Sequence, residues 1–202
     1  MSEHGTTDVP VIVVTGLPRS GTSMMMRMLQ AGGVAVLTDG IRAADADNPY
    51  GYYEFEPVKR LKHDQSWVAS ARGRAVKVVY ALLDQLPAST PYKVIFMRRH
   101  VQEVVASQDA MLSRRGTPVV PSQSQHVIQL FEEELRKVDR WLAAQRRFHV
   151  LHVDYNQAIT DPGTACARVN AFLELNLDET RMRSVVTPAL YRQRAADRHH
   201  LS

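Results

Sequence analysis

The stretch that follows the apolar run Val11–Thr15 has the residue types and spacing of a phosphate-binding loop. Gly16 is followed by four residues, by Gly21, and by two hydroxyl residues that open a stretch with helical spacing. Glycines let successive backbone N–H groups point inward, and the positive end of the following helix adds to their attraction for an anion. The Walker signature of nucleotide hydrolases has lysine after the second glycine, whereas this chain has Thr22 there and carries its basic residue earlier, at Arg19. The loop therefore predicts an anion site of a different kind.

A second candidate anion site follows the apolar run Lys93–Met97, where two arginines stand in succession. Arg99 offers a planar guanidinium that can hold a phosphate through two hydrogen bonds, and Ser107, eight residues later, can donate one more. The spacing permits these two side chains to converge but does not require it. We expect the other arginine, Arg98, to be solvated or paired with an acid.

The segment Pro18–Ser23 resembles the loop that holds the 5′-phosphosulfate in sulfotransferases that use 3′-phosphoadenylyl sulfate (PAPS). That family also has an arginine at the end of a strand and a serine eight residues later, which grip the 3′-phosphate. The similarity extends from about Val11 to Arg192, although His100–Gln102 departs from the Asp-Pro-Arg found in many members. Near the adenine it implies Tyr155, which suits a buried core position equally well. The implied donor site consists of Arg19, Ser20, Gly21, Thr22, Ser23, Arg99, Ser107 and Tyr155.

The same resemblance leaves the catalytic base open. Many members have a histidine two residues after a lysine in the strand before the 3′-phosphate motif, but this chain has Val79 two residues after Lys77. Other branches use a glutamate from the region after the first helix, where Glu54 follows an aromatic-rich turn that could raise its pKa by desolvation. Glu54 is the first candidate base, and a first-turn helix acid is an equally good interpretation of it. Asp39 is the second, because it stands where the tyrosyl-protein branch of the family has a base, although its position favours an ordinary turn aspartate. We expect Lys77 either to stabilise the leaving phosphate or to be a surface lysine at a strand end.

Apolar runs rich in Val and Ile alternate with stretches of helical spacing, which is typical of an α/β fold with a parallel sheet. The predicted strands are Val11–Thr15, Ala75–Tyr80, Lys93–Met97 and Val150–Val153, and the predicted helices are Thr22–Leu29, Pro57–Val68, Gln102–Leu112, Gln125–Leu142 and Pro162–Leu173. Right-handed crossovers would place helices on both faces of a P-loop-type sheet. Ser122 with Gln125 predicts a capping box before the longest helix, and Asp161 before Pro162 predicts another helix start.

The composition indicates one globular domain. The chain has 202 residues, of which 45% are hydrophobic and 23% charged, and a tail over 192–202 that is predicted to fray. No run approaches the ~20 apolar residues that span a membrane, and the first ten residues are polar, so we expect a cytoplasmic protein. The net charge is only +4, with basic residues scattered along the chain, and does not predict a nucleic-acid partner. Cys166, the one cysteine, is predicted to be a small core residue.

These features predict a sulfotransferase that moves a sulfuryl group from PAPS to a hydroxyl or amine of a small acceptor, without a metal. The loops Thr38–Tyr53 and Arg114–Ser124 are predicted to shape the acceptor pocket. One alternative is a P-loop kinase for a nucleoside or small molecule, with Asp154 after an apolar run as its Walker B acid, but Thr22 replaces the lysine that such an enzyme needs. The other is a non-catalytic nucleotide-binding domain, which the valine at position 79 favours.

Overall fold

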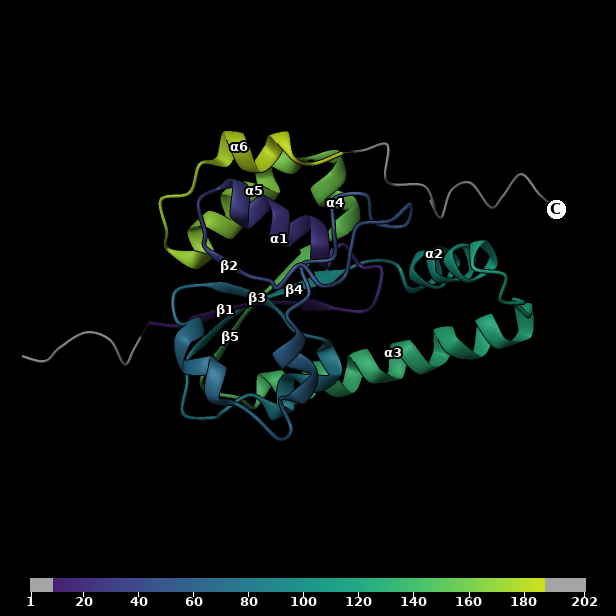
Figure 1. Ribbon diagram of the computed structural model, residues 1–202, viewed down its shortest axis with the longest axis horizontal. Helices are drawn as coiled ribbons and strands as arrows, with labels where there is room; N and C mark the ends of the chain where they lie inside the picture. Colours follow the sequence, from purple (N-terminus) through teal and green to yellow (C-terminus); the bar gives the residue numbers. More distant parts are fainter. Residues whose placement is uncertain (1–8, 188–202) are drawn as a thin grey trace, which may run out of the picture.

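The computed structural model describes residues 9–187, and a parallel sheet of five strands lies at the centre of this part of the chain (Figure 1). The spatial order is β2-β3-β1-β4-β5, and every pair of neighbours is parallel. The strands are β1 Val11–Gly16, β2 Val36–Leu37, β3 Ala75–Lys77, β4 Tyr92–Arg98 and β5 Phe148–Asp154. The predicted tail over 192–202 lies outside the described residues.

Helices cover both faces of this sheet, which confirms the predicted α/β class. Figure 1 shows α1, α4, α5 and α6 on one side and α3 with the 3₁₀ helices on the other, while α2 and α3 extend together beyond one end of the sheet. The α-helices are α1 Thr22–Ala31, α2 Val101–Arg114, α3 Pro121–Ala143, α4 Tyr155–Thr160, α5 Pro162–Leu173 and α6 Glu179–Ser184, and the 3₁₀ helices are η1 Glu56–Arg60, η2 Ser66–Ala71 and η3 Tyr80–Gln85.

The central strand β1 explains why two helical layers are needed. All six of its residues are buried, and successive side chains point to opposite faces of the sheet. Ile12 and Val14 pack in the core beneath α1 and α5, and Val11 and Val13 pack in the core beneath η2 and the end of α3. Cys166 is fully buried in the first of these cores, which confirms its predicted position.

The segment Pro57–Val68 does not form the single helix that its spacing predicts. It is divided between η1 and η2, and the intervening residues form a turn. Asp64 accepts hydrogen bonds from both the backbone N–H and the hydroxyl of Ser66, and such local side-chain bonds compete with helix formation. Strand β3 is likewise shorter than predicted, because the chain enters η3 at Tyr80.

Two helix starts test the predicted caps. Helix α3 begins at Pro121 with Val120 as its N-cap, so the predicted capping box of Ser122 and Gln125 is wrong. A proline suits the first helical position because the N–H that it lacks would have no intrahelical partner there. Asp161 does cap α5, accepting a 3.1 Å hydrogen bond from the N–H of Thr164, as predicted.

Candidate active site

The carboxyl ends of the central strands open onto a cavity of about 430 Å³. Strand β1 lies between β3 and β4, so the strands that follow it in the chain are divided between its two sides. Ligands of parallel α/β sheets bind at the carboxyl ends of the strands at such a point. The walls come from the loop after β1, the segment over 42–59, the end of β3, one face of α2, and Tyr155. The cationic residues that line it are Arg19, Arg42, Lys59, Lys77, Arg99 and Arg114, and the acidic ones are Asp47 and Glu54.

The glycine loop forms one wall and has the curled backbone that its sequence predicts. Gly16 and Gly21 have φ angles of 149° and 95°, and Arg19 between them has a φ of 68°. The N–H of Met25 donates to the carbonyl of Gly21, and no side chain caps α1, so the amides before Met25 have no partner within the helix. A Cβ at Gly21 would lie 2.3 Å from Cδ2 of Tyr155, so this position also needs glycine for lack of space.

The hydroxyl residues of the loop differ in where their side chains lie. Thr22 and Ser23 line the cavity, and the Ser23 hydroxyl donates to the carbonyl of Tyr52 at 3.2 Å. Ser20 is 1% exposed and its Oγ packs against Gly16, so this side chain does not line the cavity. Of the predicted donor residues, Ser20 is therefore the one whose side chain is kept from the cavity.

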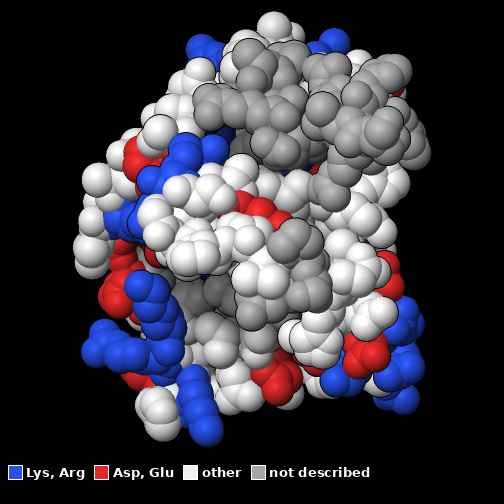
Figure 2. Space-filling view, turned by 90° about the vertical axis from the view of Figure 1, so that its right-hand side faces the viewer, with Lys and Arg blue, Asp and Glu red and all other residues white. Residues whose placement is uncertain are grey.

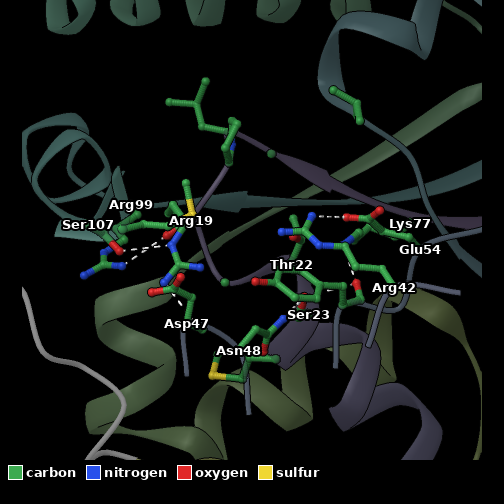
Figure 3. Close-up of a pocket in the computed structure, with 18 of the residues that line it drawn as sticks. Arg19, Thr22, Ser23, Arg42, Asp47, Asn48, Glu54, Lys77, Arg99 and Ser107 are labelled. Carbon is green, nitrogen blue, oxygen red and sulfur yellow. Dashed lines mark hydrogen bonds and ion pairs between the residues drawn. The ribbon is translucent and has the colours of Figure 1, made fainter. Parts of the chain in front are cut away.

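The second predicted anion motif opens into the same cavity, but its contacts differ from the expected ones. Ser107 accepts a 3.1 Å hydrogen bond from Nε of Arg19, while Nη1 of Arg99 donates to the carbonyl of Arg19 at 3.1 Å. Arg19 thus contacts both members of the predicted pair, as the dashed lines in Figure 3 show. Burial lowers the pKa of Arg19, and the nearby positive charges of Arg99 and Arg114 lower it further, against the opposing effect of Asp47.

A buried carboxylate that the sequence analysis missed holds Arg99. Nε of Arg99 donates to Oε2 of Glu103 at 3.0 Å, and the side chains are 6% and 2% exposed. Asn156 donates to the other carboxylate oxygen of Glu103 at 3.1 Å. The signal was an acid four residues after the arginine, the spacing at which helix side chains meet. Arg98, by contrast, pairs with Asp139 and donates to Nδ1 of His152, which confirms the expected acid-paired arginine.

Tyr155 is part of both the hydrophobic core and the cavity wall. It is 6% exposed and packs in the core beneath α1, yet it also lines the cavity. The guanidinium carbon of Arg99 lies 4.7 Å from the centre of its ring, a distance typical of a cation–π contact. Desolvation raises the pKa of its hydroxyl, so the phenol stays neutral.

The opposite end of the cavity contains Lys77, Glu54 and Arg42, with Thr22 between this group and the arginines around Ser107 (Figure 3). Lys77 donates to the carbonyl of Tyr52, and desolvation lowers its pKa to about 8. It is therefore a partly buried cation in the wall of the cavity. Glu54 accepts a 2.7 Å hydrogen bond from Nη1 of Arg42, a partner that the sequence analysis did not predict.

The other candidate base lies elsewhere. Asp39 is exposed and accepts a 3.0 Å hydrogen bond from the N–H of Ile41, and backbone hydrogen bonds, first that from Glu56, lower its pKa. It is not among the residues that line the cavity, whereas Glu54 is. Val79 does line the cavity and is 50% exposed. Asp154, the acid of the kinase alternative, instead caps α4 by accepting from the N–H of Gln157.

The two predicted pocket loops contribute unequally. The segment over 38–53 supplies Arg42, Asp47 and Tyr52 among other lining residues, whereas Arg114 is the only lining residue that the described part of the 114–124 segment supplies. Asp47 and Arg42 carry no motif of their own, so spacing alone could not single them out. On the face shown in Figure 2, basic side chains lie in separate groups with acidic side chains beside them.

About half of the chain matches a known protein family. Residues 80–179 match the model of the sulfotransferase family. The chain belongs to the sulfotransferase family. The matched half of this sulfotransferase-family chain includes Arg99, Ser107 and Tyr155, and the glycine loop precedes it. None of the curated protein sequences matches the chain.

Solved sulfotransferases share the fold of this family member. The sulfotransferase domain of the Synechococcus PCC 7002 olefin synthase is 16% identical, with a TM-score of 0.53 over 96% of this chain and 90% of that domain. Sulfotransferase STF1 from Mycobacterium tuberculosis is 19% identical, with a TM-score of 0.60 over 92% of this chain and 74% of that one. A mouse sulfotransferase complexed with PAP is 16% identical, with a TM-score of 0.52 over 91% of this chain and 63% of that one. At these identities the likeness establishes the α/β fold of this sulfotransferase-family chain.

Proposed function

We propose that this protein transfers a sulfuryl group from PAPS to a hydroxyl or amine of a small organic acceptor. The observation that carries the proposal is that the glycine loop and the Arg99–Ser107 motif, which lie far apart in the sequence, line one cavity. Six cationic side chains and two acidic ones line it, an excess that suits a ligand with several negative charges. Family membership and the shared fold support the same reaction class.

The donor would be held at two ends. The amides at the start of α1 and the hydroxyls of Thr22 and Ser23 suit a phosphosulfate, because a helix N-terminus attracts anions through its unpaired N–H groups. Arg19, Arg99 and Ser107 suit the 3′-phosphate, because guanidinium groups bind phosphate through paired hydrogen bonds. Tyr155, which lines the cavity between Gly21 and Arg99, would lie beside the nucleoside.

The acceptor would approach from the end that contains Lys77 and Glu54. Its oxygen or nitrogen forms a bond to sulfur while the bond from sulfur to the bridging phosphate oxygen breaks, which leaves adenosine 3′,5′-bisphosphate. Glu54 takes the proton of the acceptor, and Nη1 of Arg42 orients its carboxylate through the 2.7 Å ion pair. Lys77 offsets the charge that develops on the leaving phosphate. The apolar side chains of Phe55, Val58 and Val79 line this end and favour an acceptor with an apolar body.

Calorimetric titration with adenosine 3′,5′-bisphosphate, and separately with ATP and Mg²⁺, tests the donor class. We expect binding of the bisphosphate and weak or absent binding of ATP–Mg²⁺. The reverse preference would support the kinase alternative and overturn the proposal. A panel of phenols, alcohols and amines with radiolabelled PAPS then tests transfer. Bisphosphate binding without any labelled product across the panel would favour a non-catalytic nucleotide-binding domain.

We infer a single-domain, cytoplasmic enzyme that needs no metal and has no nucleic-acid partner. Support for the location comes from Cys166, which is the one cysteine and is buried and unpaired, as is usual in reducing compartments. In the described range 9–187, none of the helices is both long and apolar enough to span a membrane.

A further inference from the structure

One face of α2 carries more of the cavity wall than the predicted serine. The residues of this helix that line the cavity are Ser107, Ala110, Met111 and Arg114. Their spacing of three, four and seven residues places them on one helical face. Arg114 is therefore aligned with Ser107 two turns further along α2, and its guanidinium reaches the same end of the cavity.

Asp47 connects this arginine to the donor site. Oδ1 of Asp47 accepts a 3.0 Å hydrogen bond from Nε of Arg114, and a second from its Nη2. The carbonyl of Asp47 accepts from Nη2 of Arg19 at 3.1 Å, and Arg19 in turn donates to Ser107. The two guanidinium groups are thus bridged by one residue, and Figure 3 shows Asp47 next to Arg19.

A built turn presents Asp47 to these arginines. Oδ1 of Asp45 accepts hydrogen bonds from the N–H groups of Asp47 and Asn48, both at 2.9 Å. The hydroxyl of Tyr52 donates to the same carboxylate at 2.8 Å, and Asn48 donates to the Ser23 hydroxyl at 3.0 Å. The Asp47 side chain is consequently 7% exposed, although that of Arg114 is 46% exposed. The turn is therefore fastened to the glycine loop and carries a buried carboxylate into the cationic end of the cavity.

The Asp47 carboxylate lies among several positive charges at this end of the cavity. Arg19, Arg99 and Arg114 are close enough for Arg99 and Arg114 to disfavour the charge on Arg19, and Asp47 favours it. Glu103 partners Arg99, which leaves Asp47 to balance the other two arginines. A phosphate bound beside Ser107 would bring two further negative charges next to the Asp47 carboxylate, and like charges at contact repel.

We propose that Arg114 is a third phosphate-binding guanidinium of the donor site and that the Asp47 carboxylate holds it until the donor's 3′-phosphate replaces that carboxylate. The inference rests on the proposed function, because it assumes a donor with a phosphate at this end. On donor binding, Arg114 exchanges one anionic partner for another. Asp47 is thus a positioning residue, and Arg114 is a binding residue.

Three single variants and two nucleotides test this by calorimetric titration. Arg114→Ala should weaken binding of adenosine 3′,5′-bisphosphate roughly tenfold or more, the loss expected for a charge-assisted hydrogen bond, and leave adenosine 5′-phosphate binding unchanged. Arg115→Ala is the matched control, since Arg115 also contacts Asp47 and Asp45 but does not line the cavity, and it should leave both affinities within about twofold. Asp47→Asn should tighten bisphosphate binding roughly two- to fivefold, because it removes the competing charge.

The results separate this inference from the function on which it rests. Equal bisphosphate affinities in Arg114→Ala and Arg115→Ala, with normal binding by the unaltered protein, would overturn the inference and leave the proposed function standing. Equal weakening of both nucleotides by Arg114→Ala would overturn the assignment to the 3′-phosphate, and weaker bisphosphate binding by Asp47→Asn would overturn the role of Asp47. If Arg114→Ala does not fold, the double variant with Asp47→Asn should still bind the bisphosphate more weakly than Asp47→Asn alone. An unaltered protein that does not bind the bisphosphate would overturn the proposed function itself.

Discussion

Replacement of Lys77 by methionine should make the protein more stable at neutral pH while it removes activity. Methionine keeps the length of the side chain and eliminates the partly desolvated charge at the end of β3. The fall of the Lys77 pKa from 10.5 to about 8 corresponds to about 3 kcal/mol of destabilisation at pH 7, at ~1.4 kcal/mol per pKa unit. The lost hydrogen bond to the carbonyl of Tyr52 offsets about 1 kcal/mol of this. We expect a net gain of about 2 kcal/mol in the free energy of unfolding.

The stability gained by Lys77→Met should depend on pH, because it depends on whether the lysine is charged. Below pH 8 the lysine is charged in both the folded and the unfolded chain, and the cost of burying its charge is complete. Between pH 8 and 10.5 the folded protein releases the proton that the unfolded chain still holds, so the stability of the unaltered protein rises with pH and the cost disappears. The advantage of Lys77→Met should therefore shrink to near zero by pH 10.

Urea unfolding of the unaltered protein and of Lys77→Met at pH 7 and pH 10 measures these differences in the free energy of unfolding. The two proteins are compared at the same pH, so the contributions of their other titrating groups cancel. Lys62→Met is the control, because Lys62 is exposed and its replacement should change the stability by less than about 0.5 kcal/mol at either pH. A Lys77→Met protein that is less stable than the unaltered protein at pH 7, or equally favoured at both pH values, would refute the argument from desolvation.

Three further substitutions address the donor and acceptor ends. Arg99→Ala should weaken bisphosphate binding by about 1.5 to 3 kcal/mol in calorimetric titration, and an unchanged affinity would remove this arginine from the site. Glu54→Gln should lower the rate of sulfuryl transfer at saturating PAPS and acceptor without altering bisphosphate affinity, so full activity in the variant would exclude Glu54 as the base. Gly21→Ala should abolish bisphosphate binding and lower the melting temperature, because its Cβ would meet the ring of Tyr155. Gly51→Ala, which also has a positive φ but open space around it, should keep its binding, and similar losses in both variants would show that backbone strain and not the clash is responsible.

The sequence predicted those features of the site that depend on a short segment of the chain. The glycine loop needs its backbone turns and the start of α1, and all of these lie within Gly16–Met25. The predicted helix caps also depend on short segments. The predicted cap at Asp161 is confirmed, whereas the predicted cap at Ser122 is wrong because a proline one residue earlier begins the helix. The helix predicted over Pro57–Val68 failed because Asp64 bonds to its own neighbours, a competition that apolar periodicity does not register.

What the sequence determined, then, was the alternation that makes a parallel α/β sheet and the residue types of two anion sites, because strand, loop and helix signals are local. Which partners those residues take was decided only in three dimensions. Ser107 bonds Arg19 instead of Arg99, Glu54 meets Arg42, and Asp47 reaches Arg114 from a loop 67 residues earlier. The physical reason is that the order of the strands brings their carboxyl ends to one edge of the sheet, and the packing of the 38–54 segment against that edge selects each contact from many that the linear spacing allows.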